Sequence, residues 1–298
     1  MIACDLGSNT LRIVKIDPLS KERLKEYEKS VRTAKNLYKT GEISQDSIQR
    51  IFYALKEADI LFDFKNNEVH CVTTEAMRKA NNSQEILKQI KNEFGLDFKI
   101  IDGQEEARLT LLGVKHAIKK CKIITNSYCV IDLGGGSTEI SFINDKDIQS
   151  KSFGFGIVKI AEKYESSIKK IENNIDEEVK IIDSFIKDKK CTHLIATAGT
   201  PTTVCAFLEG IDYKNYDYKK INGKSLHVED FSKALSKLLR MDKKSREFWV
   251  GTNRSDLVCA GILIVIAIMK KLKFENCIVI DDSLREGLAI SKCKINVI

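Results

Sequence analysis

The pattern of apolar and polar residues predicts two clusters of β-strands in this chain. Each cluster opens with a short apolar strand that is followed by two more strands, and residues 11–16 alternate with the period of two that half-buried strands show. The two clusters therefore repeat one design along the chain. The expected strands cover residues 2–4, 11–16 and 23–33 in the first cluster and residues 128–131, 140–143 and 148–153 in the second.

Helices are expected after each of these strand clusters. Between residues 44 and 64, apolar side chains such as Ile48, Ile51 and Leu55 recur at the spacing of one helix face. Ser83 is predicted to cap the next helix. Because helices and strands alternate, the predicted fold class is α/β. The other expected elements are helices over 83–94, 174–186, 229–239 and 255–269 and strands over 69–73, 98–101, 193–198 and 277–281.

Two domains are expected, but composition does not mark the boundary between them. The chain has only two prolines and no low-complexity linker. We therefore place the boundary just before the apolar strand that opens the second cluster. The predicted domains are residues 1–122 and 123–298.

Both opening strands end in the same tripeptide, Asp-Leu-Gly, and the two copies lie 127 residues apart, at Asp5 and Asp132. A tight turn between two strands presents backbone N–H groups to an anion, and glycine lets a phosphate approach closely. One such turn is typical of an ordinary hairpin, whereas two matched copies favour a pair of phosphate-binding turns. The predicted phosphate contacts are Ser8, Asn9, Thr10, Gly134, Gly135, Gly136, Ser137 and Thr138.

The aspartates of the two tripeptides are candidate metal ligands. Paired domains would bring Asp5 and Asp132 to the floor of one cleft, where carboxylate oxygens beside phosphate favour Mg²⁺. Glu139 follows Asp132 by seven residues and could join the metal directly or through water. A solvated strand end is the alternative for Glu139.

The charge balance of the chain is compatible with an anionic substrate, but it does not by itself indicate one. The formal charge is +7, yet the 49 basic and 42 acidic residues are interleaved along most of the chain. A mildly cationic surface suits a polyanion, although a biased genome would produce the same composition. We expect no nucleic-acid partner.

The longest apolar run, residues 257–269, is shorter than the roughly 20 residues that span a bilayer, so we expect a buried helix and no membrane partner.

The cysteines and histidines predict neither disulfides nor structural zinc. The nine cysteines form no Cys-x-x-Cys pair, and the four histidines show no metal-ligand spacing. Small buried hydrophobes in a reducing compartment explain these cysteines best. The chain opens on a strand rather than a secretory leader, so a cytoplasmic location is expected.

Six motifs together resemble the exopolyphosphatase and guanosine pentaphosphate phosphohydrolase (Ppx/GppA) family, in its short two-domain form. They cover residues 5–10, 73–78, 103–109, 132–139, 196–200 and 282–287. The resemblance implies two ribonuclease-H-like domains of the actin and acetate-kinase type, with a cleft between them. It also implies Mg²⁺-assisted hydrolysis of terminal phosphates of inorganic polyphosphate, conversion of guanosine pentaphosphate to tetraphosphate as a second activity, and a homodimer.

The resemblance also assigns roles to single residues. Glu106, in the Gly-x-Glu-Glu-Ala-Arg motif at residues 103–108, would orient or deprotonate the attacking water, with Glu139 as a second catalytic carboxylate. Glu105 is expected to be an acid that merely favours a helix start. Arg78 would reach the phosphates, and a surface charge is its alternative. Gly199 and Thr200 would contact the nucleotide side, or simply form a strand-to-helix turn. Weaker candidates for a polyanion track are Arg12, Arg32 and Arg254.

Two departures from the family pattern limit these expectations. The usual Arg-Leu-Gly-x-Gly stretch lacks its glycines here, at residues 32–36, which puts substrate contacts there in doubt. Longer members continue into a helical carboxy-terminal domain that is not present in this sequence. We therefore expect weaker processivity and a preference for short polyphosphate.

Other functions remain open at this point. A non-catalytic sensor that binds guanosine tetraphosphate or pentaphosphate would explain the altered residues 32–36, although Glu106, Asp132 and Glu139 favour catalysis. A small-molecule kinase of the same fold would explain the twin turns. An actin-like filament protein would have no use for Glu106.

Overall fold

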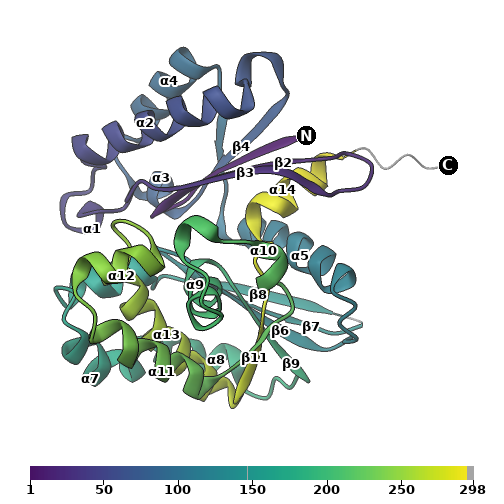
Figure 1. The fold of residues 1–298 in the computed structure, drawn as a ribbon, viewed down its shortest axis with the longest axis vertical. Helices are drawn as coiled ribbons and strands as arrows, with labels where there is room; N and C mark the ends of the chain where they lie inside the picture. Colours follow the sequence, from purple (N-terminus) through teal and green to yellow (C-terminus); the bar gives the residue numbers. More distant parts are fainter. Residues whose placement is uncertain (146, 294–298) are drawn as a thin grey trace. The chain divides into compact units, whose positions relative to one another are not determined.

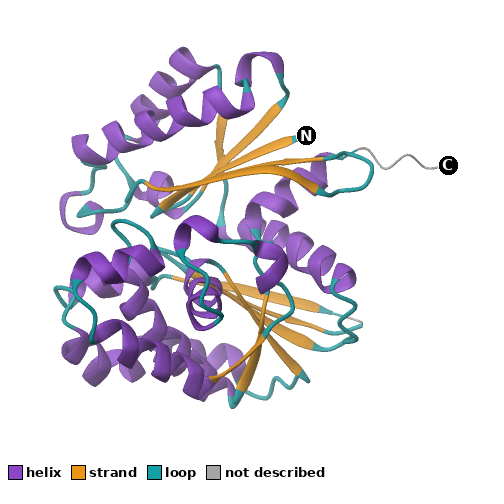
Figure 2. Cartoon of the chain, viewed as in Figure 1, coloured by secondary structure: helices purple, strands orange, loops and turns teal. Residues whose placement is uncertain are grey.

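The computed structural model describes residues 1–145 and 147–293, which form two compact units (Figure 1). Unit 1 combines Met1–Lys115 with the segment that begins at Asp282, and unit 2 is His116–Asp281. Helices and strands alternate in both units (Figure 2). The predicted α/β fold class is confirmed.

Unit 1 is built on a five-stranded mixed sheet with the order β3-β2-β1-β4-β5. The central strands β1, β4 and β5 are parallel, while β2 and β3 form antiparallel hairpins on one side. The carboxyl ends of the three parallel strands therefore meet at one edge of the sheet. The strands are β1 (Ile2–Leu6), β2 (Thr10–Ile16), β3 (Arg23–Ser30), β4 (Val69–Thr73) and β5 (Phe98–Ile100).

Helices cover both faces of this sheet. The helices α2 and α4 lie over one face, and α14 and the first part of α5 lie over the other (Figure 1). Ser44 caps α2 by accepting from the N–H of Ser47, whereas the predicted cap at Ser83 is wrong, because Ser83 is the first residue of α4. The helices are α1 (Leu37–Thr40), α2 (Gln45–Phe62), η1 (Phe64–Asn66), α3 (Glu75–Lys79), α4 (Ser83–Phe94), α5 (Gly103–Lys120) and α14 (Leu284–Lys292).

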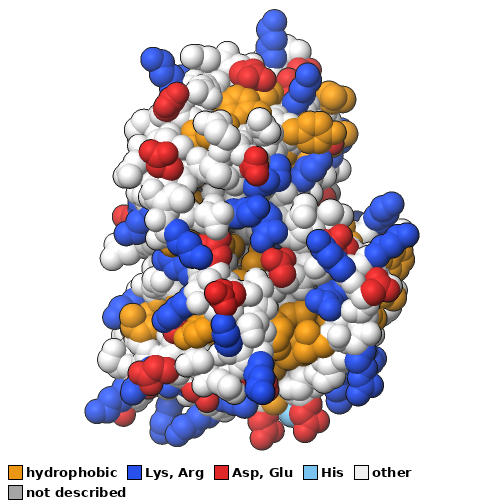
Figure 3. All heavy atoms as spheres, turned by 90° about the vertical axis from the view of Figure 1, so that its left-hand side faces the viewer, with side chains coloured by type: hydrophobic (Ala, Val, Ile, Leu, Met, Phe, Trp, Pro, Cys, Tyr) orange, Lys and Arg blue, Asp and Glu red, His pale blue; other side chains and the backbone are white. Residues whose placement is uncertain are grey.

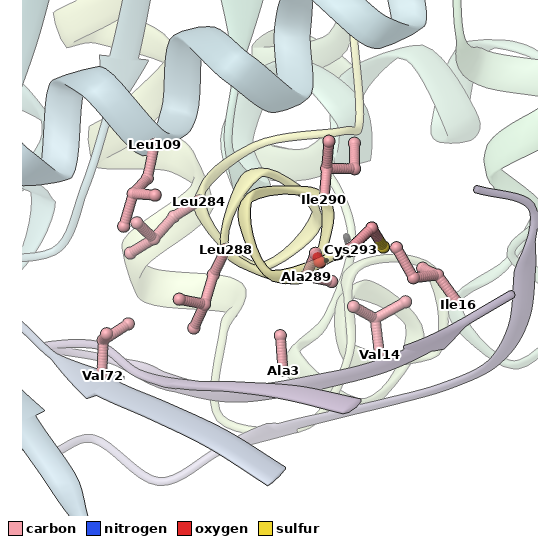
Figure 4. Close-up of a cluster of buried hydrophobic side chains, with 10 residues drawn as sticks. All are labelled: Ala3, Val14, Ile16, Val72, Leu109, Leu284, Leu288, Ala289, Ile290 and Cys293. Atoms are coloured by element: carbon pink, nitrogen blue, oxygen red, sulfur yellow. Dashed lines mark hydrogen bonds between the residues drawn. The ribbon is translucent and has the colours of Figure 1, made fainter. Parts of the chain in front are cut away.

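The last helix, α14, belongs to the core of unit 1. Its Leu288 and Ala289 pack against Ala3 and Val14 of the sheet, with Leu109 of α5 on its other side (Figure 4). The predicted domains, 1–122 and 123–298, assigned this segment to the second half. The compact units differ because the apolar face of α14 is buried on the first sheet, a contact between segments far apart in sequence.

Glycines allow α5 and α14 to cross at very short range. A Cβ atom on Gly287 would lie 1.8 Å from the carbonyl oxygen of Leu109, and one on Gly113 would lie 2.3 Å from that of Ser283. Real Cβ atoms do not approach backbone so closely. Both positions therefore require glycine, and the crossing fixes how α5 lies on unit 1.

Unit 2 repeats the sheet of unit 1 with one strand added. Its order is β10-β11-β9-β6-β7-β8, in which β6, β9 and β11 are parallel. Hairpins again lie beside the first strand of the unit, so both units follow one strand order. The strands are β6 (Tyr128–Leu133), β7 (Thr138–Ile143), β8 (Ile148–Phe153), β9 (His193–Thr197), β10 (Ser225–His227) and β11 (Asn276–Val279).

The core of unit 2 contains the apolar helix α13, which packs against α6, α7, α9 and α11. In the part of the chain that the structure describes, no helix is both long and apolar enough to cross a membrane. The expected helix over 174–186 begins earlier and is interrupted. The helical segments are α6 (Ile157–Lys163), α7 (Ile168–Glu178), η2 (Val179–Ile182), α8 (Asp183–Ile186), α9 (Gly199–Leu208), η3 (Tyr213–Asn215), α10 (Tyr218–Ile221), α11 (Val228–Leu239), α12 (Lys243–Val250) and α13 (Ser255–Leu272).

Charged side chains of both signs are mixed on the surface. Over the face shown in Figure 3, basic and acidic side chains lie next to one another, with apolar side chains between them. This agrees with the interleaving of charge along the sequence. The net charge therefore does not by itself mark a binding site.

Candidate functional site

The first Asp-Leu-Gly tripeptide forms the turn between β1 and β2, as predicted. The N–H of Gly7 donates to the carbonyl oxygen of Thr10 at 3.0 Å and closes the turn. The Ser8 side chain is buried, and Asn9 donates weakly to the Thr10 hydroxyl at 3.4 Å. Asp5, the residue before the end of β1, is 8% exposed and lies opposite Arg12 in the β1–β2 pairing.

The second tripeptide forms the corresponding turn between β6 and β7. The N–H of Gly134 donates to the carbonyl oxygen of Ser137, again at 3.0 Å, which repeats the bond of the first turn 127 residues later. A Cβ atom on Gly134 would lie 2.9 Å from that same oxygen, so the tight turn requires glycine there. The two turns are therefore the same structure, one in each unit.

In each unit, the segment that follows the third strand, β3 or β8, forms backbone hydrogen bonds with the turn. In unit 2, the N–H groups of Ile157 and Val158 donate to the carbonyl oxygens of Gly134 and Gly135 at 3.0 and 2.8 Å. The Thr138 hydroxyl donates to Phe155 at 2.8 Å and holds the same segment. These bonds occupy the carbonyl oxygens of Gly134 and Gly135 and hold the backbone of the turn in place.

Gly156, a residue that the sequence did not lead us to expect, is part of this support. A Cβ atom on Gly156 would lie 2.6 Å from backbone atoms of Gly135 and Gly136. Only glycine permits the supporting segment to lie this close to the turn. In the sequence, the pair Gly154 and Gly156 directly after a predicted strand is the feature that could have indicated this close approach.

Two acidic residues face each other beside the second turn. Asp132 and Glu139 are opposite one another in the β6–β7 pairing, which places their side chains on one face of the sheet. They are 9% and 2% exposed, and Ser152 donates to Glu139 Oε1 at 2.6 Å. These carboxylates supply the hard oxygen ligands that Mg²⁺ prefers, and they lie beside the predicted phosphate-binding turn. Within residues 1–145 and 147–293, no group of three or more His, Cys, Asp or Glu side chains has the geometry of a metal site.

Glu106 lies in the first turns of α5, where the sequence placed it. The Asp102 side chain caps this helix by accepting from the N–H groups of Gln104 and Glu105 at 3.0 and 2.9 Å. The Oε2 atom of Glu106 is buried. Asp102, which the sequence analysis did not single out, therefore fixes the start of the helix that carries Glu106.

Glu105 and Glu106 differ in their surroundings. Glu105 forms two hydrogen bonds with Arg108, at 2.6 and 2.7 Å. This ion pair lowers the pKa of Glu105, and the effect is small in energy because the pair is exposed. Glu105 is therefore held in an exposed ion pair, whereas an oxygen of Glu106 is buried.

Arg78 lies at the same edge of the first sheet as Asp5 and Glu106. Its guanidinium donates to the carbonyl oxygen of Ile101, the residue before the cap of α5. The carboxyl ends of β1, β4 and β5 point to this edge, which is where open α/β sheets bind ligands. Unit 1 thus gathers these three predicted residues at one edge.

Gly199 and Thr200 begin α9 directly after β9, which lies beside Asp132 in the second sheet. Ala198 precedes them with φ of 73°, a left-handed conformation that is costly for a residue with a Cβ atom. The Thr200 side chain packs against Gly261, where an added Cβ would lie 2.2 Å from its hydroxyl. The Thr200 side chain therefore points to α13, and only the backbone of Thr200 could contact a ligand at the start of α9.

Arg254, the residue that directly precedes α13, supports the same helix start. It is 7% exposed, and its Nη2 atom donates to Thr203 Oγ1 at 3.1 Å and to the Gly199 carbonyl oxygen at 3.4 Å. The guanidinium also lies 5.5 Å from the centre of the Tyr213 ring. Arg254 therefore stabilises the turn at Gly199.

A cavity of about 510 Å³ in unit 2 lies elsewhere. It is found at the carboxyl end of α9, the opposite end from Gly199, and is lined by Glu209, Lys220 and Lys224 among others. Ten residues of helix separate the two ends by about 15 Å. The cavity is therefore separate from the predicted phosphate-binding turns.

The cysteines behave as the sequence predicted for small hydrophobes. All nine are free, and all but Cys121 and Cys191 are buried. Burial raises the pKa of Cys205 to about 11 and that of Cys277 to about 12, so both are thiols at neutral pH.

Comparison with known proteins identifies the family to which this protein belongs. The model of the Ppx/GppA phosphatase family matches residues 12–295, and the chain belongs to this family. The family recognition made from sequence is confirmed. A family member from Aquifex aeolicus has a solved structure with 27% sequence identity and a TM-score of 0.74, which covers 98% of this chain and 96% of that one. The predicted α/β fold with two units, each built on a mixed sheet, therefore agrees with the fold of this family member.

Other similar proteins carry more specific names. An exopolyphosphatase from Cytophaga hutchinsonii has a TM-score of 0.83 at 24% identity, covering 98% of this chain and 97% of that one, and supports the fold alone. The guanosine-5'-triphosphate,3'-diphosphate pyrophosphatase of Pseudoalteromonas translucida is 26% identical over 295 residues, which are 96% of this chain and 58% of that protein. The bifunctional 3-dehydroquinate synthase/phosphatase of Fusobacterium nucleatum is 24% identical over 286 residues, 89% of this chain and 42% of that protein. The chain thus spans about half the length of these two relatives.

Proposed function

We propose that this family phosphatase is a Mg²⁺-dependent phosphohydrolase that releases terminal phosphate from inorganic polyphosphate. The observation that carries the proposal is the matched pair of turns, each closed by the same 3.0 Å bond, at Gly7 and at Gly134. A phosphoanhydride substrate offers two adjacent phosphoryl groups, one for each turn. The cleft in which both turns would reach one substrate is part of the proposal.

Glu106 would position the attacking water. In-line attack on a phosphoryl group needs a carboxylate that orients water, and little covalent chemistry from the protein. Glu106 is suited to this role because the cap at Asp102 fixes its helix and Arg78 is held beside the start of that helix. Arg78 would bind the phosphoryl oxygens and stabilise their charge.

Mg²⁺ would be held by Asp132 and Glu139, with Asp5 of unit 1 as a further ligand. When bound, the metal supplies positive charge that neutralises the phosphoryl oxygens. The protein's own part is to keep both carboxylates buried and oriented, which the hydrogen bond from Ser152 to Glu139 does on one side. The matched turns contribute N–H groups that bind the phosphate oxygens.

Conversion of guanosine pentaphosphate to tetraphosphate is the second candidate. The specific observation in its favour is the 26% identity to the pyrophosphatase of Pseudoalteromonas translucida, whose name states this substrate class. Both reactions break a terminal phosphoanhydride bond. They differ only in whether the protein recognises guanosine, for which Gly199 and the start of α9 are the candidates.

Phosphate release from polyphosphates of graded length, with guanosine pentaphosphate alongside, tests both candidates. We expect release that depends on Mg²⁺ and stops when the metal is chelated. Binding of guanosine tetraphosphate with no release from any substrate would favour the sensor, and phosphate transfer from ATP to an acceptor would favour the kinase. The homodimer implied by the family is also proposed, and sedimentation velocity measures it.

A further inference from the structure

The first phosphate-binding turn is supported by residues 31–34, which connect β3 to α1. The N–H groups of Val31 and Arg32 both donate to the carbonyl oxygen of Asn9, at 2.9 and 2.8 Å, and that of Ala34 donates to Ser8 at 2.7 Å. The bond from Ala34 to Ser8 has its counterpart in unit 2, where Val158 donates to Gly135 at the equivalent position of the second turn. Residues 31–34 therefore determine where the tip of the first turn lies.

Two side chains of α2 hold residues 31–34 in turn. Arg50 Nε donates to the carbonyl oxygen of Val31 at 3.0 Å, and Ser47 Oγ donates to that of Arg32 at 2.8 Å. Arg50 Nη2 donates to Ser47 Oγ at 2.7 Å, which joins the two contacts. The peptide group between Val31 and Arg32 is thus bound at both ends, by its N–H to Asn9 and by its carbonyl to Arg50.

The backbone here needs such restraint. Arg32 has φ of 51° and Asn36 has φ of 60°, both in the left-handed region that is costly for residues other than glycine. Asn tolerates this conformation better than other residues, whereas Arg gains nothing from it. In unit 2 the same support uses Gly156, which approaches the turn directly. Unit 1 has no glycine in residues 31–36 and uses side chains of α2 instead.

Burial and charge make these bonds stronger than ordinary surface contacts. Ser47 is fully buried. Burial lowers the pKa of Arg50, and nearby Arg32 lowers it further while Asp46 raises it. A guanidinium nevertheless stays charged at neutral pH, so its bond to Val31 is a charge-assisted one.

We propose that Ser47 and Arg50 are positioning residues that hold the first phosphate-binding turn through residues 31–34. They compensate for the glycines that this chain lacks in the family's Arg-Leu-Gly-x-Gly stretch. The link to catalysis rests on the proposed function, but the link to the turn does not. Neither residue belongs to the motifs that carry the family resemblance.

Hydrogen exchange measured by NMR, in the full chain, tests the link to the turn. In Arg50→Gln and Ser47→Ala we expect the amides of Arg32 and Ala34 to exchange about tenfold faster than in the unchanged protein, since a hydrogen bond has been lost. The double variant should add little to either single variant, because both act on one network. Lys56→Gln removes an exposed charge from the same helix and should change nothing.

Phosphate release from short polyphosphate tests the link to catalysis. We expect kcat/KM to fall about tenfold in both single variants, with an unchanged Mg²⁺ requirement, because the metal ligands are elsewhere. Exchange of the Arg32 and Ala34 amides that stays unchanged, or that rises equally throughout the chain, would overturn the proposal. If the unchanged protein releases no phosphate, the proposed function fails, while the exchange measurement still decides on the positioning residues.

Discussion

At the scale of residues, the two units differ at one pair of equivalent positions. Beside the first turn, Asp5 faces Arg12, and beside the second turn Asp132 faces Glu139. Arg12 also forms an ion pair with Glu28 at 3.1 Å. An aspartate opposite an arginine is compensated in charge, whereas two buried carboxylates repel each other unless a cation is near. In the proposed function, unit 2 therefore supplies the main Mg²⁺ ligands.

Asp132→Ala should raise the Mg²⁺ concentration needed for half-maximal phosphate release by at least about tenfold, since even outer partners of a metal site contribute that much. Metal titration of the release rate measures it. Asp176→Ala removes an exposed acid from α7 and should leave the titration unchanged. An identical Mg²⁺ requirement in the Asp132 variant would refute its role as a ligand.

Glu106→Ala should lower kcat by at least about a hundredfold while KM changes little, because a positioned acid–base group acts on the transition state. Glu105→Ala is the matched control one residue away. It removes only an exposed ion pair with Arg108 and should cost little. Equal losses in the two variants would count against a catalytic role for Glu106.

At the scale of elements, the closing motif at residues 282–287 has a structural role in unit 1. Arg285 bonds Glu286 at 2.5 Å and Glu26 at 3.1 Å, and Arg23 bonds Glu26 at 2.6 Å and Glu286 at 3.1 Å. This network of mostly buried charges joins the start of α14 to β3. Removal of one member would leave its partners buried and incompletely paired, which is strongly destabilising.

Gly287→Ala should destabilise the protein by about 2 kcal/mol or more, because the new methyl group would overlap the Leu109 carbonyl and push α5 away. Since α5 carries Glu106, kcat should fall as well. Thermal unfolding measures the stability. Gly154→Ala is the control, because a Cβ atom there meets nothing within 4 Å, and a similar loss of stability in both variants would argue against the close crossing.

At the scale of the whole molecule, the chain passes between the units twice. It leaves unit 1 within α5, between Lys115 and His116, and returns between Asp281 and Asp282. A double connection of this kind suits a hinge, in which a few residues absorb the change while each unit stays rigid. In the proposed function, closure of this hinge on the substrate would exclude water from the reaction.

Hinge closure predicts a smaller radius of gyration when a non-hydrolysable polyphosphate analogue and Mg²⁺ are added. Small-angle scattering with and without the analogue measures this change. The Asp132→Ala variant, with its weakened metal site, should show less compaction at the same Mg²⁺ concentration. A radius that stays constant while calorimetry shows binding would exclude closure.

Local patterns in the sequence determined the repeat that organises this protein. The apolar strands, the hairpin turns at Gly7 and Gly134 and the bounds of β4 and α4 all follow from residues close together in the chain. The family motifs, too, are short. For these features, neighbouring residues alone decide the backbone conformation.

Tertiary structure decided the contacts between distant segments. The packing of α14 on the first sheet, the close approach of Gly156 to the second turn, and the support of residues 31–34 by Ser47 and Arg50 join residues that no local pattern connects. Short elements such as β10 likewise form only because a neighbouring strand is present. Their stability comes from burial and hydrogen bonds that exist only once the chain has folded.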